Sequence, residues 1–404
     1  MSTSLLYHGF GIRGYNYVRT EYSEGKIKFC ILQNPDTICC PQCQEQNYIC
    51  KGTVTRTFKA TPLGTKEILI ELPVQRIECL LCEKIHQVKV NFAKQMRGYT
   101  NAFERYVTDL CRMLPISDVA KLLKVSWGTI KDIEKRYLKK HYDKPRLKDI
   151  TRIAIDEIYL GKKTKYVTLV MDLDTGAVVF VGDGKGADAL APFWKRLRYS
   201  HAKIKAVAMD MGPAYIKAVK ENLSDVPIIF DHFHVIKLYN EKLTELRRDL
   251  QREAEPGEGK EVLKGTRWLL LKSAEKLDET KSEKEKLDEA LKLNKPLSIA
   301  YYLKDELGQI WKQNTRKQAD KLLWNWCKKA AVSGITTLYN FAVRLMKFSD
   351  EILAYYDFNK MSSGPMEGTN NKIKTLQKRA YGYRDMEFFK LKVMALHETR
   401  YANL

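Results

Sequence analysis

The fold of this chain is decided by the stretch Thr151–Val179, which reads TRIAIDEIYLGKKTKYVTLVMDLDTGAVV. Asp156 ends a short apolar, β-branched run, and Lys165 to Leu173 forms a second run that alternates and then becomes apolar. Asp174-Thr175-Gly176 supplies a turn, and a third run continues from Ala177 to Val181. Strand-like runs separated by turn residues predict an antiparallel meander of three strands.

Asp156 follows an apolar strand, where a carboxylate loses solvation and therefore usually has a function. We predict that Asp156 is the first metal ligand of a nuclease-type active site. Oxygen ligands of this kind select Mg²⁺ or Mn²⁺. The alternative is that Asp156 caps a turn and Glu157 is the true ligand.

The sequence after the meander alternates between helices and short strands. The expected elements are a helix at Ala187–Arg198, a strand at Ile204–Met209, a helix at Ala214–Asn222 and a strand at Val226–Phe230, followed by a long helix. Three strands, then helix, strand, helix, strand and helix, is the order of a ribonuclease H-like fold. Asp210 directly follows the fourth strand, so adjacent central strands would place it beside Asp156. The alternative for Asp210 is an Asx-turn before Gly212-Pro213.

The chain from 251 to 349 has no strand signal, and we predict an all-helical insertion that interrupts the catalytic core. The core then has a first part at 150–250 and a last part at 350–404. Lys272–Lys292 is expected to be a heavily charged helix, and Trp311, Trp324 and Trp326 are expected to be core residues rather than platforms on which bases stack.

A third acid follows the insertion, in the sequence SSGPMEGTNNKIKTLQKR. Serine followed by proline is a helix-start signature, which places Glu367 in the first turn of a helix that continues through Arg379. The alternative is that Glu367 merely favours the helix N-terminus. The same helix carries cations that could hold DNA phosphates, namely Lys372, Lys374, Lys378 and Arg379.

The overall charge of the chain indicates a polyanionic partner. Lys and Arg number 70 against 49 Asp and Glu, a net charge of +21, so nucleic acid is the expected partner. A basic surface that binds nothing is the alternative. No run approaches a membrane span, and the N-terminus lacks a signal-peptide core, so we expect a soluble, intracellular protein without a membrane partner.

Two Cys-x-x-Cys pairs, Cys40 with Cys43 and Cys79 with Cys82, predict a structural four-cysteine Zn²⁺ site in an N-terminal β module at 1–95. Disulfides are not expected in a reducing compartment. Cys39 competes with Cys40 as a ligand, and small buried cysteines are the alternative to zinc.

Residues 96–145 have helical periodicity throughout. We expect three helices. The first ends at Pro115, the second covers Ile116–Leu123, and the third begins after Ser126, which is its N-cap. Short helices with a tight link predict a helix-turn-helix, whose second helix enters the major groove of DNA. The candidate DNA contacts on that helix are Lys131, Lys135 and Arg136. An ordinary helical bundle with a solvated basic face is the alternative.

These motifs together resemble the ISL-three family of bacterial insertion-sequence transposases, within the DDE group. The resemblance covers nearly the whole chain, from the double Cys-x-x-Cys through IAIDE and AVAMDM to SSGPMEGTNNKIKTLQKRAYGYR. It implies catalytic roles for Asp156, Asp210 and Glu367 in Mg²⁺-dependent or Mn²⁺-dependent DNA cleavage and strand transfer. It also implies a cytoplasmic, nucleoid-associated bacterial protein that binds the element's terminal repeats and target DNA, and we expect a homodimer on DNA.

Asp231 and His234 match a motif of related transposases near the active site. The resemblance implies that they support the catalytic acids or position DNA, while a helix-capping role for Asp231 and a core role for His234 are the alternatives. For the whole chain, the alternatives are a zinc-dependent DNA-binding regulator with an inert transposase-derived core and a junction-resolving nuclease. The second does not explain the zinc module or the helix-turn-helix.

Charge reversal at Lys131 and Lys135 tests the groove role. We expect K131E/K135E to weaken duplex binding, because each lysine that contacts a phosphate contributes to affinity through counterion release. Titration of a labelled duplex by fluorescence anisotropy measures this change. Unchanged affinity would count against the groove role.

Overall fold

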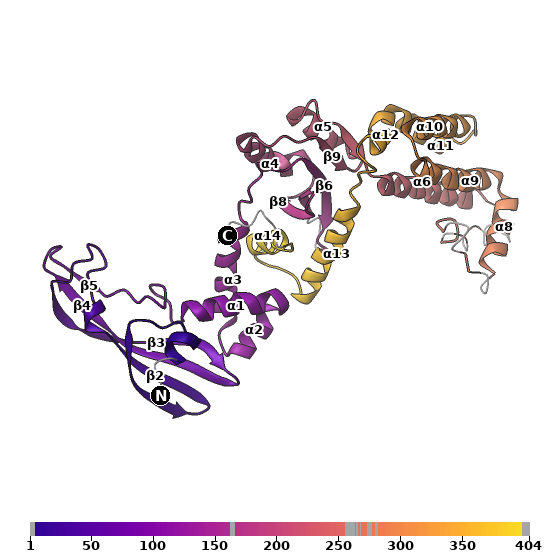
Figure 1. Ribbon diagram of the computed structural model, residues 1–404. Coiled ribbons are helices and arrows are strands. Elements are labelled where there is room, and N and C mark those ends of the chain that lie inside the picture. The colour runs from indigo at the N-terminus through magenta and orange to yellow at the C-terminus, as the bar shows by residue number, and fades with distance from the viewer. Residues whose placement is uncertain are drawn as a thin grey trace. The chain divides into compact units, whose positions relative to one another are not determined.

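The computed structural model describes residues 5–161, 166–254, 263, 266, 268–272, 277–278 and 282–397 (Figure 1). The chain divides into two compact units. The first comprises Met1–Lys140 with Arg379–Gly382, and the second comprises His141–Lys378 with Tyr383–Leu404. The five predicted segments are finer than these two units, and their boundaries stay predictions.

The first unit begins with a five-stranded sheet. Its strands are β1 (Tyr15–Ser23), β2 (Lys26–Gln33), β3 (Tyr48–Leu63), β4 (Lys66–Cys79) and β5 (Lys84–Gln87). The order is β1-β2-β4-β3, with β5 also paired to β4. Alternate residues of β4 are buried, so one face of the long β3–β4 hairpin carries the core of this module.

Three helices follow in the same unit: α1 (Asn101–Met113), α2 (Ile116–Leu123) and α3 (Trp127–Tyr142). Thr100 caps α1 by accepting from the Phe103 amide, and Ser126 accepts from the Thr129 amide at 3.2 Å to begin α3. Lys124 adopts the left-handed conformation in the tight link, with φ of 50°. The predicted helices and the Ser126 cap are confirmed.

The second unit is built on another five-stranded sheet. Its strands are β6 (Arg152–Tyr159), β7 (Tyr166–Asp172), β8 (Ala177–Asp183), β9 (Ala206–Met209) and β10 (Ile228–Phe230). The order is β10-β9-β6-β7-β8. The pairs β6–β7 and β7–β8 are antiparallel, which confirms the meander, whereas β6–β9 and β9–β10 are parallel. This is the ribonuclease H-like topology.

Helices connect and cover this sheet: α4 (Ala187–Ser200), α5 (Pro213–Asn222) and α6 (His232–Glu253). Gly182 shows how closely α4 approaches β8, because a Cβ at this position would lie 2.3 Å from the Ala189 carbonyl oxygen. Helix α5 connects β9 to the parallel strand β10, and α6 follows β10 and leads out of the sheet.

Between α6 and the last part of the core lie further helices: α8 (Glu283–Leu293), α9 (Lys295–Gln309), α10 (Arg316–Ala331), α11 (Thr336–Lys347) and α12 (Ser349–Asp357), with a short 3-10 turn, η5 (Ile310–Lys312), before α10. No strand occurs in the described residues of this region. The helix predicted for Lys272–Lys292 begins only at Glu283; Lys272, Leu277 and Asp278 are not helical, and 273–276 and 279–281 lie outside the described residues.

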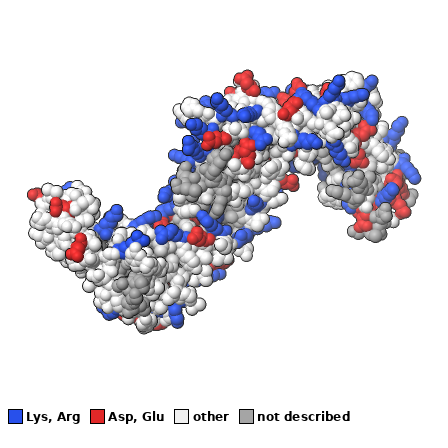
Figure 2. All heavy atoms as spheres, in the orientation of Figure 1, with Lys and Arg blue, Asp and Glu red and all other residues white. Residues whose placement is uncertain are grey.

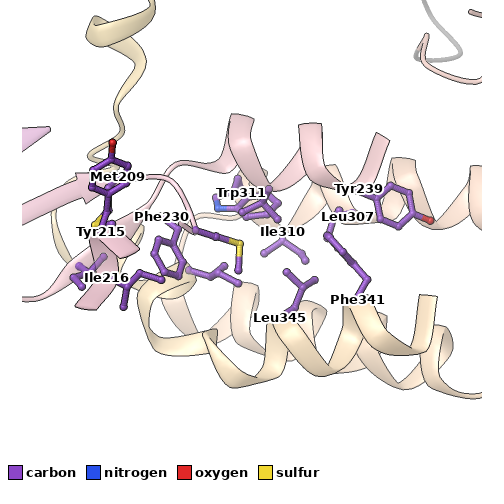
Figure 3. Packing of buried hydrophobic residues seen from close by; sticks show 14 of the residues in the cluster. Met209, Tyr215, Ile216, Phe230, Tyr239, Leu307, Ile310, Trp311, Phe341 and Leu345 are labelled. Carbon is purple, nitrogen blue, oxygen red and sulfur yellow. The ribbon is translucent and has the colours of Figure 1, made fainter. Parts of the chain in front are cut away.

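These helices share one apolar core with the sheet. Figure 3 shows the buried side chains running from Met209 and Phe230, at the ends of β9 and β10, to Leu307 and Phe341 of α9 and α11. Two tryptophans belong to this core as predicted, with exposed fractions of 6% for Trp311 and 2% for Trp326.

The prediction for Trp324 was wrong, because its side chain is 54% exposed. Trp324 and Trp326 are two positions apart on α10, so they point about 200° apart around the helix. When Trp326 faces the core, Trp324 must face outward.

The chain returns to the sheet through α13 (Gly364–Arg379) and α14 (Met386–Met394). Helix α13 runs beside β6 in Figure 1. The predicted helix start is confirmed, with Glu367 in the first turn. Among the described residues, no helix is long and apolar enough to cross a membrane.

Candidate functional site

The first two acids are brought together by the pairing of β6 with β9. The register joins Ile153 to Val207 and Ala154 to Ala208. Two residues further along these parallel strands come Asp156 and Asp210. Both side chains are half-buried, and the Asp210 charge acts on Asp156. Asp156 does not end its strand as predicted, because β6 continues to Tyr159. It lies just beyond the residues of β6 that pair with β9, and there it forms one acidic patch with Asp210.

Asp156 lies in a mixed environment. Burial raises the pKa of its carboxyl group and Asp210 adds to that rise, while three partners oppose it. The Asn370 amide donates to Oδ2 at 2.7 Å, the Glu157 backbone N–H donates to Oδ1 at 2.7 Å, and His234 contributes a favourable charge. These donors hold the carboxylate in one orientation.

Glu157 has a different neighbourhood from Asp156. Its Oε2 accepts from the Tyr215 hydroxyl at 3.4 Å, and that hydroxyl also contacts the Thr168 hydroxyl at 2.9 Å. Successive residues of a strand point to opposite faces. The geometry therefore favours Asp156 over Glu157 as the acid that Asp210 and α13 approach.

Asp210 forms the Asx-turn that the sequence offered as the alternative to a metal-binding role. Its Oδ1 accepts from the Gly212 amide at 3.0 Å, and a Cβ at Gly212 would lie only 2.8 Å from that oxygen. Helix α11 supports the same loop, because Arg344 donates to the Met211 carbonyl oxygen at 2.9 Å. The turn orients the carboxylate beside Asp156, so the two roles of Asp210 are compatible.

The first half of α13 is attached to the strand ends at two points. Ser363 donates from Oγ to Asp231, and Asn370 donates to Asp156. Glu367 lies between these two positions, one turn before Asn370, and its side chain is exposed. Residues three apart lie on neighbouring positions of a helix surface, so Glu367 is next to Asn370 on α13.

The carboxylate oxygens of the three acids do not lie close enough together to form a compact cluster of ligands. Among the described residues, the cysteines are the one group of possible metal ligands whose atoms all lie within 4.8 Å of one another. Asp156, Asp210 and Glu367 are therefore not all within that distance of one another, and two carboxylates brought to ~4 Å without a cation would repel by about 1 to 4 kcal/mol.

Asp231 follows β10 as Asp210 follows β9, because Phe230 pairs with Met209. It is 3% exposed and caps α6 by accepting from the Phe233 amide at 3.0 Å. Its other oxygen accepts from Ser363, so the capping residue also anchors α13. His234, one turn into α6, is half-buried and acts on Asp156 through its charge.

Sequence reasoning missed Asn370 and Ser363. Asn370 is notable because its Nδ2 contacts Asp156 while its Oδ1 is buried and meets no hydrogen-bond donor among the described residues. An oxygen of that kind beside two carboxylates is a further candidate ligand for a hard cation. The sequence contained a signal for Asn370, since a residue three positions after Glu367 lies beside it on the same helix.

The four predicted zinc ligands lie together in the first unit. The thiols of Cys40, Cys43, Cys79 and Cys82 form a cluster within 4.8 Å. The Cys43 backbone N–H helps lower the pKa of Cys40 to about 7, while contact with Cys43 raises the pKa of Cys82 to about 12. Cys39 lies outside the cluster, and its thiol contacts Gln44 at 3.5 Å.

The predicted DNA contacts occupy varied environments. Lys131 lies over the Trp127 ring at 5.5 Å, and Trp127 is 54% exposed in the first turn of α3. Lys135 is half-buried. Arg136 donates to the Tyr99 hydroxyl at 2.6 Å and to Glu104 at 3.2 Å, so a DNA contact would have to compete with these bonds.

The cations of α13 are exposed, and Lys372 lies 3.0 Å from His397. Lys374 and Lys378 extend the same charge along the helix, and Arg379 is its last residue. All of these DNA contacts stay predictions.

A ribonuclease H-like sheet with one acid on its central strand and another directly after the neighbouring parallel strand defines a class: nucleic-acid enzymes that transfer phosphoryl groups. Family models then identify the chain more closely. Residues 153–393 match a model described as a transposase, residues 88–138 match the helix-turn-helix domain of transposase family ISL3, and residues 36–82 match the zinc-finger of transposase IS204/IS1001/IS1096/IS1165. The chain belongs to the transposase family ISL3.

Individual relatives agree with this assignment. The chain is 29% identical to the transposase for insertion sequence element IS1001 of Bordetella parapertussis, over 95% of this chain and 96% of that one. It is also 29% identical to the transposase for IS1557 of Mycobacterium tuberculosis, over 85% and 82% of the two chains. The Drosophila P element transposase strand transfer complex aligns with a TM-score of 0.40 and 12% identity, over 74% of this chain and 92% of that one, a likeness too distant to carry an argument.

The resemblance stated from the sequence is therefore confirmed, together with the ribonuclease H-like core, the zinc-finger segment and the helix-turn-helix. The protein is a DNA transposase, and its family implies DNA cleavage and transfer.

The cysteine cluster generates a metal-content prediction. We expect about one zinc per purified chain by elemental mass spectrometry, and loss of that zinc with a lower melting temperature in C82S, because a three-thiolate site binds weakly. C39S is the matched control and should retain zinc. Zinc retained in C82S, or lost equally in both variants, would contradict the assignment.

The Asn370 contact generates a pH prediction. Asn370 opposes the raised pKa of Asp156, so N370A should raise that pKa further and move the acid limb of the DNA-cleavage profile to higher pH. N371A, which alters the exposed neighbour, should leave the profile in place. Cleavage rates measured from pH 5 to 9 compare the variants, and coincident acid limbs would contradict the role of Asn370.

Proposed function

We propose that this transposase cleaves and joins DNA with a DDE triad of Asp156, Asp210 and Glu367 that binds Mg²⁺ or Mn²⁺. The observation that supports this most is the β6–β9 register, which sets Asp156 and Asp210 at matching positions of neighbouring strands, with α13 attached alongside by Asn370.

The donor set suits a hard divalent cation. Carboxylate and amide oxygens are the ligands that Mg²⁺ and Mn²⁺ prefer, and Asn370 Oδ1 adds a buried oxygen that lacks a donor among the described residues. Asp156, Asp210 and Glu367 would hold the cations. When bound, such ions activate a water or a DNA 3′-hydroxyl and stabilise the leaving oxygen during in-line attack on phosphorus.

The surrounding residues orient the carboxylates of Asp156 and Asp210. Asn370 and the Glu157 amide fix the orientation of Asp156, and the Gly212 amide fixes Asp210. The Asn370 and Glu157 N–H groups favour the charged form of Asp156 despite its burial. Glu367 is exposed in the first turn of α13, one turn before Asn370, so it is available to bind a cation.

The first unit serves DNA recognition in this proposal. Zn²⁺ held by Cys40, Cys43, Cys79 and Cys82 stabilises the β module, and the helix-turn-helix reads the element's terminal repeats through α3. Lys131, Lys135 and Arg136 are the proposed contacts there, and Lys372, Lys374, Lys378 and Arg379 are the proposed phosphate contacts on α13. Asp231 and His234 support the acids.

We further propose that the protein acts as a homodimer on DNA. Two element ends must be processed together, and a C₂ arrangement is the usual solution for two identical chains. A zinc-dependent regulator with an inert core is the competing function, and it predicts the same salt-sensitive DNA binding. Cleavage separates the two possibilities.

The decisive test is D156N, assayed on DNA that carries the element ends and their flanks, with magnesium. We expect cleavage to fall roughly a thousandfold or more, a loss of about 4 kcal/mol of transition-state stabilisation, because one charged ligand is lost. Duplex affinity should change little. D225N, which removes an exposed acid outside the site, is the control and should cleave normally. Persistent cleavage by D156N would show that another acid serves, and no cleavage by the unaltered protein would favour the regulator.

A further inference from the structure

Helix α10 carries a row of exposed cations with an aromatic residue among them. Lys317, Lys321, Trp324 and Lys328 are all exposed, and we call these four residues the α10 outer face. The opposite side of the helix is buried through Ala319, Leu323, Trp326, Cys327 and Ala330. The helix therefore needs no further partner to fold, and its outer face is available to a ligand.

The spacing of these residues makes one continuous surface. Steps of four, three and four positions keep all four side chains within roughly 60° of each other at 3.6 residues per turn. Lys317 and Lys328 are then about 16 Å apart along the helix axis at 1.5 Å per residue. The surface is long and narrow, with Trp324 between Lys321 and Lys328.

The cations of this face differ from the others on the same helix. Arg316 pairs with Asp350 and Asp357, and Lys329 pairs with Glu306 at 2.8 Å. Among the described residues, no carboxylate lies within ion-pair distance of Lys317, Lys321 or Lys328. The exposed Asp320 lies three residues after Lys317 and four before Trp324, so one acid borders the three lysines, and the face keeps a net positive charge that is directed outward.

Trp324 gives this surface a second chemical property. Its side chain is 54% exposed, and the Lys328 ammonium lies 5.5 Å from the ring centroid. Burying a tryptophan side chain releases a large hydrophobic free energy, which an exposed tryptophan does not obtain. The exposure of Trp324 beside a cation therefore indicates a partner that offers both anionic groups and flat or apolar groups. DNA offers phosphates beside deoxyribose rings and bases.

We propose that the α10 outer face binds the sugar–phosphate backbone of duplex DNA, with the three lysines on phosphates and Trp324 packed against the deoxyribose rings. Figure 2 shows basic side chains, with acidic ones among them, over the surface in the region of α10 to α12. A duplex carries one negative charge per ≈ 1.7 Å of its axis, so a row about 16 Å long meets several phosphates. The proposal rests on the protein acting on DNA and not on which acids are catalytic.

The insertion then has a function as well as a place in the fold. Its inner helical faces share a core with the sheet, and its outer face adds a DNA contact to those proposed for α3 and for α13. Contacts of this kind hold DNA without reading its sequence.

The test compares two triple variants of the full chain that lose equal charge. K317Q/K321Q/K328Q alters the α10 outer face, and K284Q/K286Q/K292Q alters exposed lysines of α8. Affinity for a 40-bp duplex of arbitrary sequence is measured from 50 to 300 mM salt, with zinc retained and without added magnesium or manganese. We expect the slope of log K against log salt to become shallower by about 2 to 3 in the α10 variant, since each phosphate contact contributes about 0.9.

The α8 variant should change that slope by less than about 1. Equal slopes in the two triple variants would overturn the proposal. Because the assay contains no catalytic metal, failure of the catalytic triad to cleave DNA cannot affect its outcome.

Trp324 is tested separately from the charge. W324A should weaken duplex affinity roughly five-fold, in line with about 1 kcal/mol for one aromatic contact, whereas W324F should retain most of it. Far-ultraviolet circular dichroism and melting temperature establish that both variants fold. Unchanged affinity in a folded W324A would remove Trp324 from the DNA surface.

Discussion

The structure of the catalytic half depends on the parallel pairing of β6 with β9. The paired residues have buried apolar side chains and include Ile153, Ala154, Val207 and Ala208. Their pairing determines which residues of the two strands lie side by side. A slip of one residue would send every side chain of the strand to the opposite face. The positions of Asp156 and Asp210 therefore follow from the register in which these apolar neighbours pack.

The helical insertion supports the same strand ends from a distance in sequence. Tyr239 of α6 donates to the Ala300 carbonyl oxygen at 2.7 Å, and Trp326 donates to the Leu303 carbonyl oxygen at 2.7 Å. Arg344 of α11 reaches the loop that follows Asp210. Because buried polar groups must be satisfied, these bonds fix how the insertion helices pack. The insertion is thus part of the scaffold of the catalytic unit.

The return of α13 to the sheet completes this arrangement. Asp231 ends a strand, caps α6 and accepts from Ser363, while Asn370 reaches Asp156 from the next turns of α13. A late segment of the chain is therefore held by polar bonds to early strands. Such bonds are directional, so they orient the helix on which Glu367 lies more tightly than apolar contact would.

The sequence by itself determined the local features of this protein. Period-two runs, turn residues, helix caps such as Ser126 and the two Cys-x-x-Cys pairs act over a few residues, so they predicted the meander, the helices of the first unit and the cysteine cluster. The order of elements then gave the ribonuclease H-like core.

Only the tertiary structure decided which residues meet across long separations. Asn370 and Asp156 are 214 positions apart, and Ser363 and Asp231 are 132 apart, so no local pattern records their contact. It also decided that Trp324 faces outward while Trp326 fills the core. Both tryptophans are equally apolar, but a helix buries only the face that its neighbours cover, and that face is set by packing.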